Sequence, residues 1–254
     1  MDVVLAADLP DIPRWIETRA MLRSGHATVF GGASAIDGYA VRVVHGAFSV
    51  VSVVGRPPAS AIVAALDGVT PMTPILAQVD NTEYVERILL EDAPNDFRGW
   101  HRERVIVYSM TSFPDPSPLD PSTTVRLLTE RDDLSHLPAG LRFEISHAIH
   151  VTPVGAALVD GVPVSFCYAC WTTESLWDVS VDTLAAYRRR GLAPHVVRFM
   201  VTHHGKDGRE PVWGALESNG LSIRLAERLG FTPVDELYAF SRGPWAYLTN
   251  GYVG

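Results

Sequence analysis

Residues 187–194 read Tyr187-Arg188-Arg189-Arg190-Gly191-Leu192-Ala193-Pro194, between a predicted strand (Trp177 to Thr183) and a predicted helix (about Leu192 to His204). A strand that turns through a basic, glycine-containing loop into a helix presents several backbone N–H groups in one direction, where the helix dipole also favours negative charge. Gly191 has no Cβ, so a phosphate group can approach the backbone closely. The pattern predicts a phosphate-binding loop, and a solvated basic turn before an ordinary helix is the alternative.

The segment that follows this helix decides between the two interpretations. A buried strand is predicted over Pro211 to Leu216, and a second helix over about Leu221 to Leu229. Gly230 comes next, at the C′ position where glycine commonly ends a helix in the left-handed conformation. These downstream elements favour the phosphate-binding interpretation over a solvated basic turn.

Two signatures in this region resemble those of the GNAT superfamily of acyl-CoA N-acyltransferases. The spacing of Arg188, Gly191 and Ala193 is similar to the superfamily's pyrophosphate-binding motif. Asn219, Ser222 and the run 225–231 are similar to its closing signature. Within the superfamily the sequence is most similar to the zwittermicin-resistance-type acetyltransferases, in the residues Val181-Asp182-Thr183, Tyr187-Arg188, Gly191-Leu192-Ala193, Pro211, Trp213, Leu225-Ala226-Glu227 and Leu229-Gly230-Phe231.

Composition limits the function classes. The chain has 254 residues, 47% of them hydrophobic, and a formal net charge of −8. This acidity argues against a nucleic-acid partner, since non-specific binding to nucleic acid needs a basic surface. It is compatible with a cationic amine substrate, although net charge also serves solubility. No apolar run reaches the roughly 20 residues that a membrane span needs, and residues 1–4 lack the basic start of a secretory signal. We therefore expect a cytoplasmic protein with no membrane partner.

The patterns predict two domains. Residues 1–111 contain a helix from Ile12 to Arg23 opened by Asp11, and then the order strand, turn, helix, strand, helix, strand, which repeats the order seen after Trp177. This indicates a degenerate GNAT-like N-terminal domain. Residues 112–122 hold four prolines and are predicted to be a semi-rigid linker. Residues 123–254 are expected to form the GNAT acetyl-CoA-binding catalytic domain. Before the basic loop it is predicted to hold a strand near 124–128, a helical or loop segment over 132–149, and strands over 155–159 and 164–171 joined by a hairpin turn at Asp160-Gly161; a last strand is predicted over 237–241. The fold class is therefore α/β, with an α+β mixed sheet: a GNAT fold in the C-terminal half, preceded by a smaller, degenerate GNAT-like domain.

The turn of the N-terminal half that corresponds to residues 188–193 reads Gly55-Arg56-Pro57-Pro58. It lacks the glycine and alanine spacing of the C-terminal loop, and its prolines remove N–H donors that a phosphate would need. We expect no second cofactor site there.

The resemblance implies transfer of an acetyl group from the cosubstrate acetyl-CoA to the amine of a small molecule, a metabolite or an antibiotic, by direct attack. Backbone donors and arginine charges of the 188–193 loop would bind the pyrophosphate. A backbone N–H near Asp182 or Thr183 would stabilise the thioester oxygen as it gains charge. The implied cofactor-binding residues are Val181, Asp182, Thr183, Arg188, Arg189, Arg190, Gly191, Leu192, Ala193, Asn219 and Ser222.

The attacking amine must lose a proton, and the chain offers three carboxylates for this step. Asp178 and Asp182 alternate with Ser180, so they share one face of the strand beside the cofactor. Glu217 follows the next strand. For each of the three, binding of a substrate ammonium group or an ordinary surface charge is the alternative to catalysis.

The departing thiolate must gain a proton, and here the sequence departs from the family. Ala226 occupies the place where many members carry a tyrosine. Ser222 or Tyr238 then takes the acid role, or coenzyme A leaves as the thiolate without help. Ser222 is equally suited to bond to its own helix backbone, and Tyr238 to pack in the core.

Neither histidines nor cysteines indicate a metal site. His147 with His150 and His203 with His204 lack a supporting carboxylate at ligand spacing. Cys167 and Cys170 form a lone C-x-x-C with no second pair to complete a zinc site, and both are expected to be buried. The three tail residues Trp245, Tyr247 and Tyr252 are suited either to cover an edge strand or to form a homodimer contact.

Two further functions fit the same residues. One is acetylation of protein N-termini or lysines, which would need an open acidic groove. The other is a non-catalytic acetyl-CoA-binding module, in which the missing tyrosine and the degenerate first half mark lost chemistry.

Overall fold

A computed structural model describes residues 2–45, 48–70, 73–91, 100–115 and 118–242. The tail residues Trp245, Tyr247 and Tyr252, predicted to cover an edge strand or form a dimer contact, lie outside these ranges. So do residues 46–47, which the sequence predicts to connect two strands as a hairpin. The described residues divide into two compact units, the first within residues 2–108, 214–223 and 233–242, and the second within residues 109–213 and 224–232. Among the described residues, no helix has both the length and the apolar character that crossing a bilayer requires.

The elements of the first 110 residues are mostly those that the sequence predicts. They are α1 Asp2–Asp8, the 3-10 helix η1 Pro13–Trp15, α2 Ile16–Arg23, β1 Ala27–Gly31, β2 Tyr39–His45, β3 Phe48–Val54, α3 Ala59–Leu66, β4 Ile75–Gln78, α4 Thr82–Glu91 and β5 His101–Met110. The sequence predicted neither α1 nor β1.

The start of the predicted helix over residues 12–23 was wrong. The segment begins as η1, preceded by Ile12 with no side-chain cap bond, and continues as α2. Asp11 is not the cap, because its carboxylate lies 3.9 Å from the guanidinium of Arg19 and so faces that cation.

The remaining elements confirm the strand and helix order predicted for the C-terminal half. They are β6 Thr123–Leu127, α5 Ala139–Val151, β7 Val154–Val159, β8 Val162–Thr172, β9 Leu176–Thr183, the 3-10 helix η3 Ala185–Tyr187, α6 Leu192–Gly205, β10 Glu210–Leu216, α7 Gly220–Arg228 and β11 Phe231–Ser241. The hairpin predicted at Asp160 and Gly161 is present, with φ values of 50° and 82°, as a two-residue turn between twisted strands requires.

In each unit an antiparallel meander leads into a parallel crossover. In the first unit the strand order is β1-β2-β3-β4-β11-β5, with β3 parallel to β4 across α3. In the second unit it is β10-β9-β8-β7-β6, with β9 parallel to β10 across α6. This recurrence supports the duplicated α/β architecture that the sequence indicates.

The last strand has a partner that the sequence did not predict. β11 pairs antiparallel with β4, joining Leu237 to Gln78 and Phe240 to Ile75. The part of β11 after Pro233 therefore belongs to the first unit, although its sequence position suggests the second. The domain boundaries 1–111 and 123–254 stay a prediction about the chain's modules.

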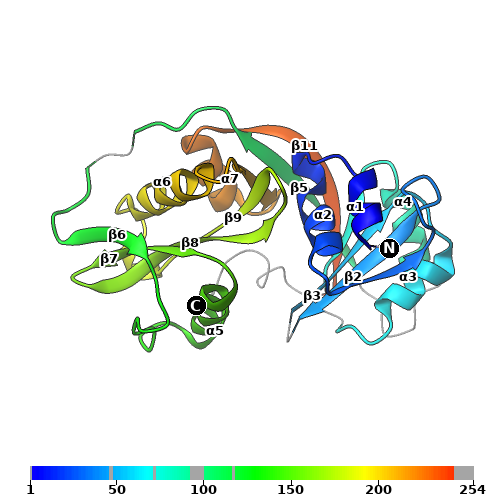
Figure 1. The fold of residues 1–254 in the computed structure, drawn as a ribbon, viewed down its shortest axis with the longest axis horizontal. Coiled ribbons are helices and arrows are strands. Elements are labelled where there is room, and N and C mark those ends of the chain that lie inside the picture. The colour runs from blue at the N-terminus through cyan, green and yellow to red at the C-terminus, as the bar shows by residue number, and fades with distance from the viewer. Residues whose placement is uncertain (1, 46–47, 71–72, 92–99, 116–117, 243–254) are drawn as a thin grey trace. The chain divides into compact units, whose positions relative to one another are not determined.

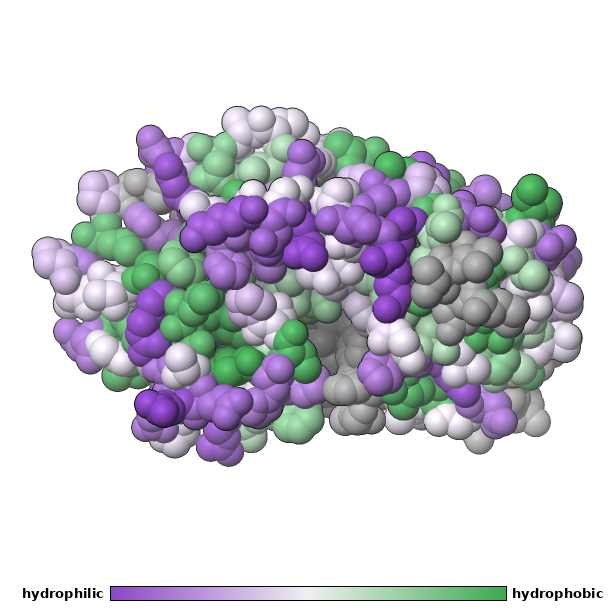
Figure 2. All heavy atoms as spheres, in the orientation of Figure 1, coloured by the Kyte–Doolittle hydropathy of each residue, from purple (hydrophilic) through white to green (hydrophobic). Residues whose placement is uncertain are grey.

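In the second unit the sheet carries helices on both faces. Figure 1 shows α6 on one side of β7 and β8 and α5 on the other. Leu141 and Ile145 of α5 pack against Phe166 and Tyr168 of β8, whereas Leu192 of α6 packs against Ala157 and Val164. On the face shown in Figure 2, hydrophilic side chains gather over α7, whose only buried residue among those described is Ala226.

The proline-rich segment 112–122 is in contact with α6 where it is described. Arg198 of α6 forms an ion pair with Asp115 and lies 6.0 Å from the ring centre of Phe113. Leu119 packs beside Leu192. These contacts place the segment along the helix that the basic loop opens.

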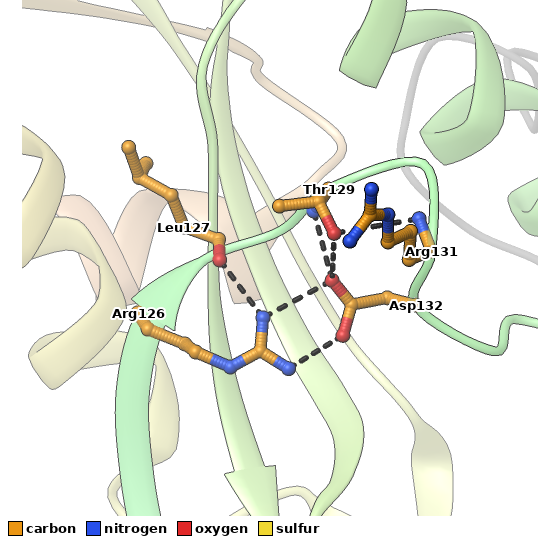
Figure 3. Close-up of polar contacts among 5 residues, drawn as sticks. All are labelled: Arg126, Leu127, Thr129, Arg131 and Asp132. Atoms are coloured by element: carbon orange, nitrogen blue, oxygen red, sulfur yellow. Dashed lines mark hydrogen bonds and ion pairs between the residues drawn. The ribbon is translucent and has the colours of Figure 1, made fainter.

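An ion pair shapes the loop between β6 and α5 (Figure 3). Arg126 donates through Nη2 to one oxygen of Asp132, 2.5 Å away, and through Nη1 to the other at 3.1 Å. The same carboxylate accepts from the backbone N–H of Thr129 at 2.8 Å and from its hydroxyl at 3.1 Å. These bonds, first of all that of Arg126, lower the pKa of Asp132 from 3.8 to about 2.

Replacing Asp132 should therefore destabilise the chain. We expect Asp132→Asn to lower the free energy of unfolding by about 1–3 kcal/mol, because it removes a charged acceptor from several donors. Since the pKa is lower in the folded state, this stabilisation is present above pH 3.8 and is lost as the pH falls toward 2. Urea unfolding of the wild type and the variant at pH 7 and pH 3 measures both effects. Asp133→Asn is the control, because the hydrogen bond that Asp133 accepts from the N–H of Ser135 can also be accepted by an amide oxygen. An equal loss in both variants would contradict the assignment.

Gly230 has the left-handed conformation predicted for the residue after α7, with φ 86°. A Cβ at this position would lie 1.9 Å from the carbonyl oxygen of Ser112. Both the backbone conformation and the close approach require glycine.

We expect Gly230→Ala to lower the free energy of unfolding by more than about 2 kcal/mol, since it adds a backbone clash to the strain of a left-handed alanine. Gly161→Ala is the matched control, because Gly161 has φ 82° and nothing lies within 4 Å of its added Cβ. Thermal and urea unfolding should show a clearly smaller loss for Gly161→Ala, and similar losses would mean that the approach of Ser112 is unimportant.

Candidate active site

The basic loop has the backbone of an anion-binding turn. Gly191 precedes the first residue of α6 with φ 77°, and Arg189 also has a positive φ, 62°. Backbone N–H groups in such turns point into a common concavity that binds anions. A Cβ at Gly191 would meet no atom within 4 Å among the described residues, so the approach to the loop is open.

The three arginines of the loop are exposed but differ in their contacts. Arg188 folds back, and its Nε donates to the carbonyl oxygen of Thr183 at 3.0 Å. The guanidinium of Arg190 lies 5.3 Å from the ring centre of Tyr187. Leu192, 3% exposed, anchors the start of the helix in the core. The loop is thus fixed at both ends, with positive charge around the helix N-terminus.

The edge of β9 next to β10 is the predicted place for the thioester. The ladder between the two strands joins Leu176–Asp178 to Glu210–Val212 and ends there. Beyond Asp178, β9 continues its ladder with β8 as far as Thr183. The predicted residues Val181, Asp182 and Thr183 therefore lie past the end of the parallel ladder, between it and the basic loop.

The two carboxylates predicted on β9 do lie on one face of the strand, together with Ser180. Register across the antiparallel pair sets Asp182 opposite Phe166 and Ser180 opposite Tyr168, so this face is the one that α5 covers. Burial raises the pKa of Asp178 to about 7. Burial first, and the charge of Glu144 second, raise the pKa of Asp182 to about 7 against the opposing effect of Arg188. A carboxyl group with such a pKa is suited to exchange protons near neutral pH.

Two residues of this face were missed by the sequence reasoning. Tyr168 of β8 donates a hydrogen bond from its hydroxyl to Glu144 of α5. Glu144 is half-buried, on the flank of a stripe formed by Leu141, Ile145 and Ala148. A carboxylate bordering the buried stripe of a helix was the available signal, but the sequence does not show which strand faces that flank.

The other predicted site residues have structural contacts. Asn219 caps α7, since its side-chain oxygen accepts the N–H of Ser222 at 3.1 Å. Glu217 is exposed and forms an ion pair with Arg104 at 3.4 Å. Tyr238 pairs with Ala77 across β11 and β4 and lies under the guanidinium of Arg102, 5.4 Å from its ring centre. All four residues belong to the first unit, and their catalytic or cofactor roles stay predictions.

Ala226, at the position where the family often has a tyrosine, is fully buried. A hydroxyl-bearing side chain is therefore absent from this place on α7. Whether Ser222 or Tyr238 acts instead stays a prediction.

The turn of the first unit that corresponds to the basic loop is filled by the chain itself. A Cβ at Gly38 would lie 2.5 Å from the backbone nitrogen of Pro57 and 2.7 Å from that of Arg56. The hydroxyl of Tyr84 donates to the carbonyl oxygen of Pro57. With two prolines and a backbone segment against it, this turn offers few N–H groups to a phosphate.

The histidines and cysteines have their own environments. His204 is buried and stacks on Trp177 at 4.5 Å, and burial lowers its pKa to about 4. His150 pairs with Glu130. Cys167 is buried as predicted, but Cys170 is exposed because it lies near the end of β8, where the ladder with β9 is irregular. Within the described ranges, no group of three or more His, Cys, Asp or Glu side chains could hold a metal ion.

A hollow of about 320 Å³ lies on the other flank of α5, beside the ion pair of Figure 3. Its lining residues are Thr129, Glu130, Asp132, Leu134, Ser135, Arg142, Ser146, Ile149 and His150. None of them belongs to the basic loop or to the carboxylate face of β9. The hollow is therefore separate from the basic loop and from the carboxylate face of β9.

Comparison with known proteins agrees with this geometry. Residues 154–240 match the family model described as GNAT acetyltransferase. These bounds run from β7 into β11 and include the basic loop and the carboxylate face. A search of curated proteins found no match.

Several solved structures have a similar fold at low identity. A GCN5-related N-acetyltransferase-like protein from Streptococcus suis is 16% identical, covers 93% of this chain and 95% of its own, and gives a TM-score of 0.63. A putative GNAT-family acetyltransferase from Novosphingobium aromaticivorans is 19% identical over 92% and 98% of the chains, with a TM-score of 0.60.

A tandem GNAT protein from the clavulanic acid biosynthesis pathway is 12% identical over 96% and 93% of the chains, with a TM-score of 0.56. At such low identities the similarity of the structures indicates the fold alone. The family match over residues 154–240 adds support from the sequence. The chain has the fold of the GNAT acetyltransferases, and together these matches support an acyltransferase enzyme.

Proposed function

We propose that this protein is an N-acetyltransferase that transfers the acetyl group of acetyl-CoA to the amine of a small molecule. The open, basic turn at Arg189 to Gly191, at the N-terminus of α6 and next to the end of the parallel ladder, is the observation that carries the proposal. The similarity to the zwittermicin-resistance-type acetyltransferases, a cytoplasmic location and a homodimer belong to the same proposal.

The reaction assigns a task to each part of the site. The amine nitrogen forms a bond to the thioester carbon as the carbon–sulfur bond breaks, which gives the amide and coenzyme A. An acceptor that arrives as an ammonium ion gives up one proton before attack. A second proton leaves the nitrogen as the amide forms, and the thiolate takes up one proton. The net products are amide, thiol and one proton released to solvent.

The residues of the loop are proposed to bind the pyrophosphate through the backbone of residues 189–193 and the charge of the arginines. Val181, Asp182 and Thr183 are proposed to align the thioester along β9. Asp182 is the preferred base, because it combines a pKa of about 7 with a place on the same strand as the proposed thioester contact. Asp178, on the same face and with a similarly raised pKa, is the second candidate.

Binding of acetyl-CoA tests the loop. Gly191→Glu should weaken acetyl-CoA binding by at least about a hundredfold. The added carboxylate repels the phosphates and weakens their charge-assisted contacts with the loop. Gly208→Glu is a matched control, because Gly208 has φ 72° and open space around its Cβ in the turn after α6. Calorimetric titration should show micromolar binding to the wild type and to Gly208→Glu only. If the wild type does not bind acetyl-CoA, both the enzyme and a non-catalytic cofactor-binding module are excluded.

Turnover tests the base. We expect Asp182→Asn to lower kcat by roughly 10²–10⁴-fold with an amine that the wild type accepts, while acetyl-CoA binding is retained. Because Asp182 must be ionised to take a proton, kcat/KM of the wild type should rise with pH through about 7. Coenzyme A release, followed with a thiol reagent, measures both. A loss in Asp178→Asn alone would move the role to Asp178. Tight cofactor binding without release by any amine would favour the non-catalytic module.

A further inference from the structure

The face of the second unit that α5 covers holds more carboxyl groups than a single base requires. Glu144 of α5 lies on this face, where it is bonded to Tyr168, while Asp178 and Asp182 lie on β9. Arg188 is the cation whose charge reaches Asp182, and its Nε is already bonded to the carbonyl oxygen of Thr183. When these carboxyl groups are ionised, this one arginine does not balance their charge, and a further cation would stabilise them.

Glu144 is held in place without being saturated. The hydroxyl of Tyr168 donates to Oε1 of Glu144, and Tyr168 also bonds to the side chain of Ser180 on β9. A carboxylate has about four acceptor positions, and the Tyr168 bond uses one of them. The tyrosine fixes the direction of the carboxylate, because its own position is set by burial at 4% exposure in the sheet.

Asp182 presents an independent sign of a missing partner. Its Oδ2 is buried and accepts no hydrogen bond from any described residue. The titratable groups whose charges interact with that of Asp182 are Glu144 of α5, Arg188 of the loop and Cys167 of β8. A buried carboxylate oxygen without a donor is costly, so such a position favours a ligand that brings N–H groups and positive charge.

We propose that Glu144 is an acceptor-binding residue, and that its carboxylate and that of Asp182 together receive the ammonium group of a primary amine on the α5 side of β9. This inference rests on the proposed function for the acetyl-CoA loop. A bound cation stabilises the ionised form of Asp182, which prepares this residue to take the proton. The substrate class is thus an amine that reaches the site as a cation, rather than a neutral amine or an alcohol.

The test compares a charged and a neutral ligand of the same shape. Benzylamine and benzyl alcohol are titrated by calorimetry into the protein saturated with coenzyme A, at pH 7.5. Glu144→Gln keeps an acceptor for Tyr168 and removes the charge, and Glu144→Asp keeps the charge but withdraws it by one methylene. Glu130→Gln is the control. Glu130 precedes α5 in the chain and pairs with His150 on the flank of the helix that faces away from β9.

We expect Glu144→Gln to weaken benzylamine binding by at least about tenfold, the loss of one hydrogen bond to a charged group. Benzyl alcohol binding should be unchanged. Glu144→Asp should lie between the wild type and Glu144→Gln, and Glu130→Gln should bind as the wild type does. With an accepted amine, the KM of that amine should rise while saturated kcat changes little.

A second readout does not depend on any amine. In carbon-13 NMR titration of the carboxyl groups, with Asp182 identified by Asp182→Asn, the pKa of Asp182 should be lower in Glu144→Gln than in the wild type. Equal benzylamine binding by the wild type and Glu144→Gln, or an unmoved pKa of Asp182, would overturn the inference about Glu144. If acetyl-CoA does not bind the wild type, the proposed function is overturned instead. If the wild type binds acetyl-CoA but no amine, only the inference about the acceptor site is overturned.

Discussion

The parallel ladder between β9 and β10 is the constraint on which the candidate site depends. Parallel neighbours need a crossover, and the helix α6 supplies it. The turn that leaves β9 must therefore lie at the carboxyl end of the strand and open a helix there, which is where ligands bind in open α/β sheets. Because the ladder stops at Asp178, the rest of β9 runs between the ladder and the basic loop. One pairing thus determines the place of the basic loop, proposed to bind phosphate, and of the strand edge proposed to bind the thioester.

The carboxyl groups on the α5 side of β9 lower the stability of the fold near neutral pH. Burial raises the pKa of Asp178 and Asp182 to about 7, from 3.8 in the unfolded chain. Since the folded state holds these protons more tightly, stability is full below pH 3.8 and falls as the pH rises toward 7. A fold selected for stability alone would not bury two such groups on one face. Functional sites are where proteins carry such local conflicts.

The corresponding turns of the two units differ in how open they are. Both contain a strand, a turn and a helix that leads to a parallel strand. In the second unit the turn is open at Gly191, whereas in the first the backbone at Gly38 packs onto Arg56 and Pro57. Asn81 then donates to the carbonyl oxygens of Val53 and Gly55, which fixes that turn further. The difference follows from two prolines and one packed segment, while the element order is unchanged.

Local chemistry determined much of this protein from the sequence alone. Gly191 and Gly230 were predictable because only glycine takes a left-handed backbone without penalty, and β9, α6, β10 and α7 followed from periodicity and helix-end signals. The tertiary structure decided what depends on residues far apart in the chain. The pairing of β11 with β4, the Tyr168–Glu144 bond and the ion pair that draws Asp11 away from a helix cap all join elements whose distance in sequence carries no signal. Local patterns state which face of an element is apolar, but the partner of that face is set by packing of the whole chain.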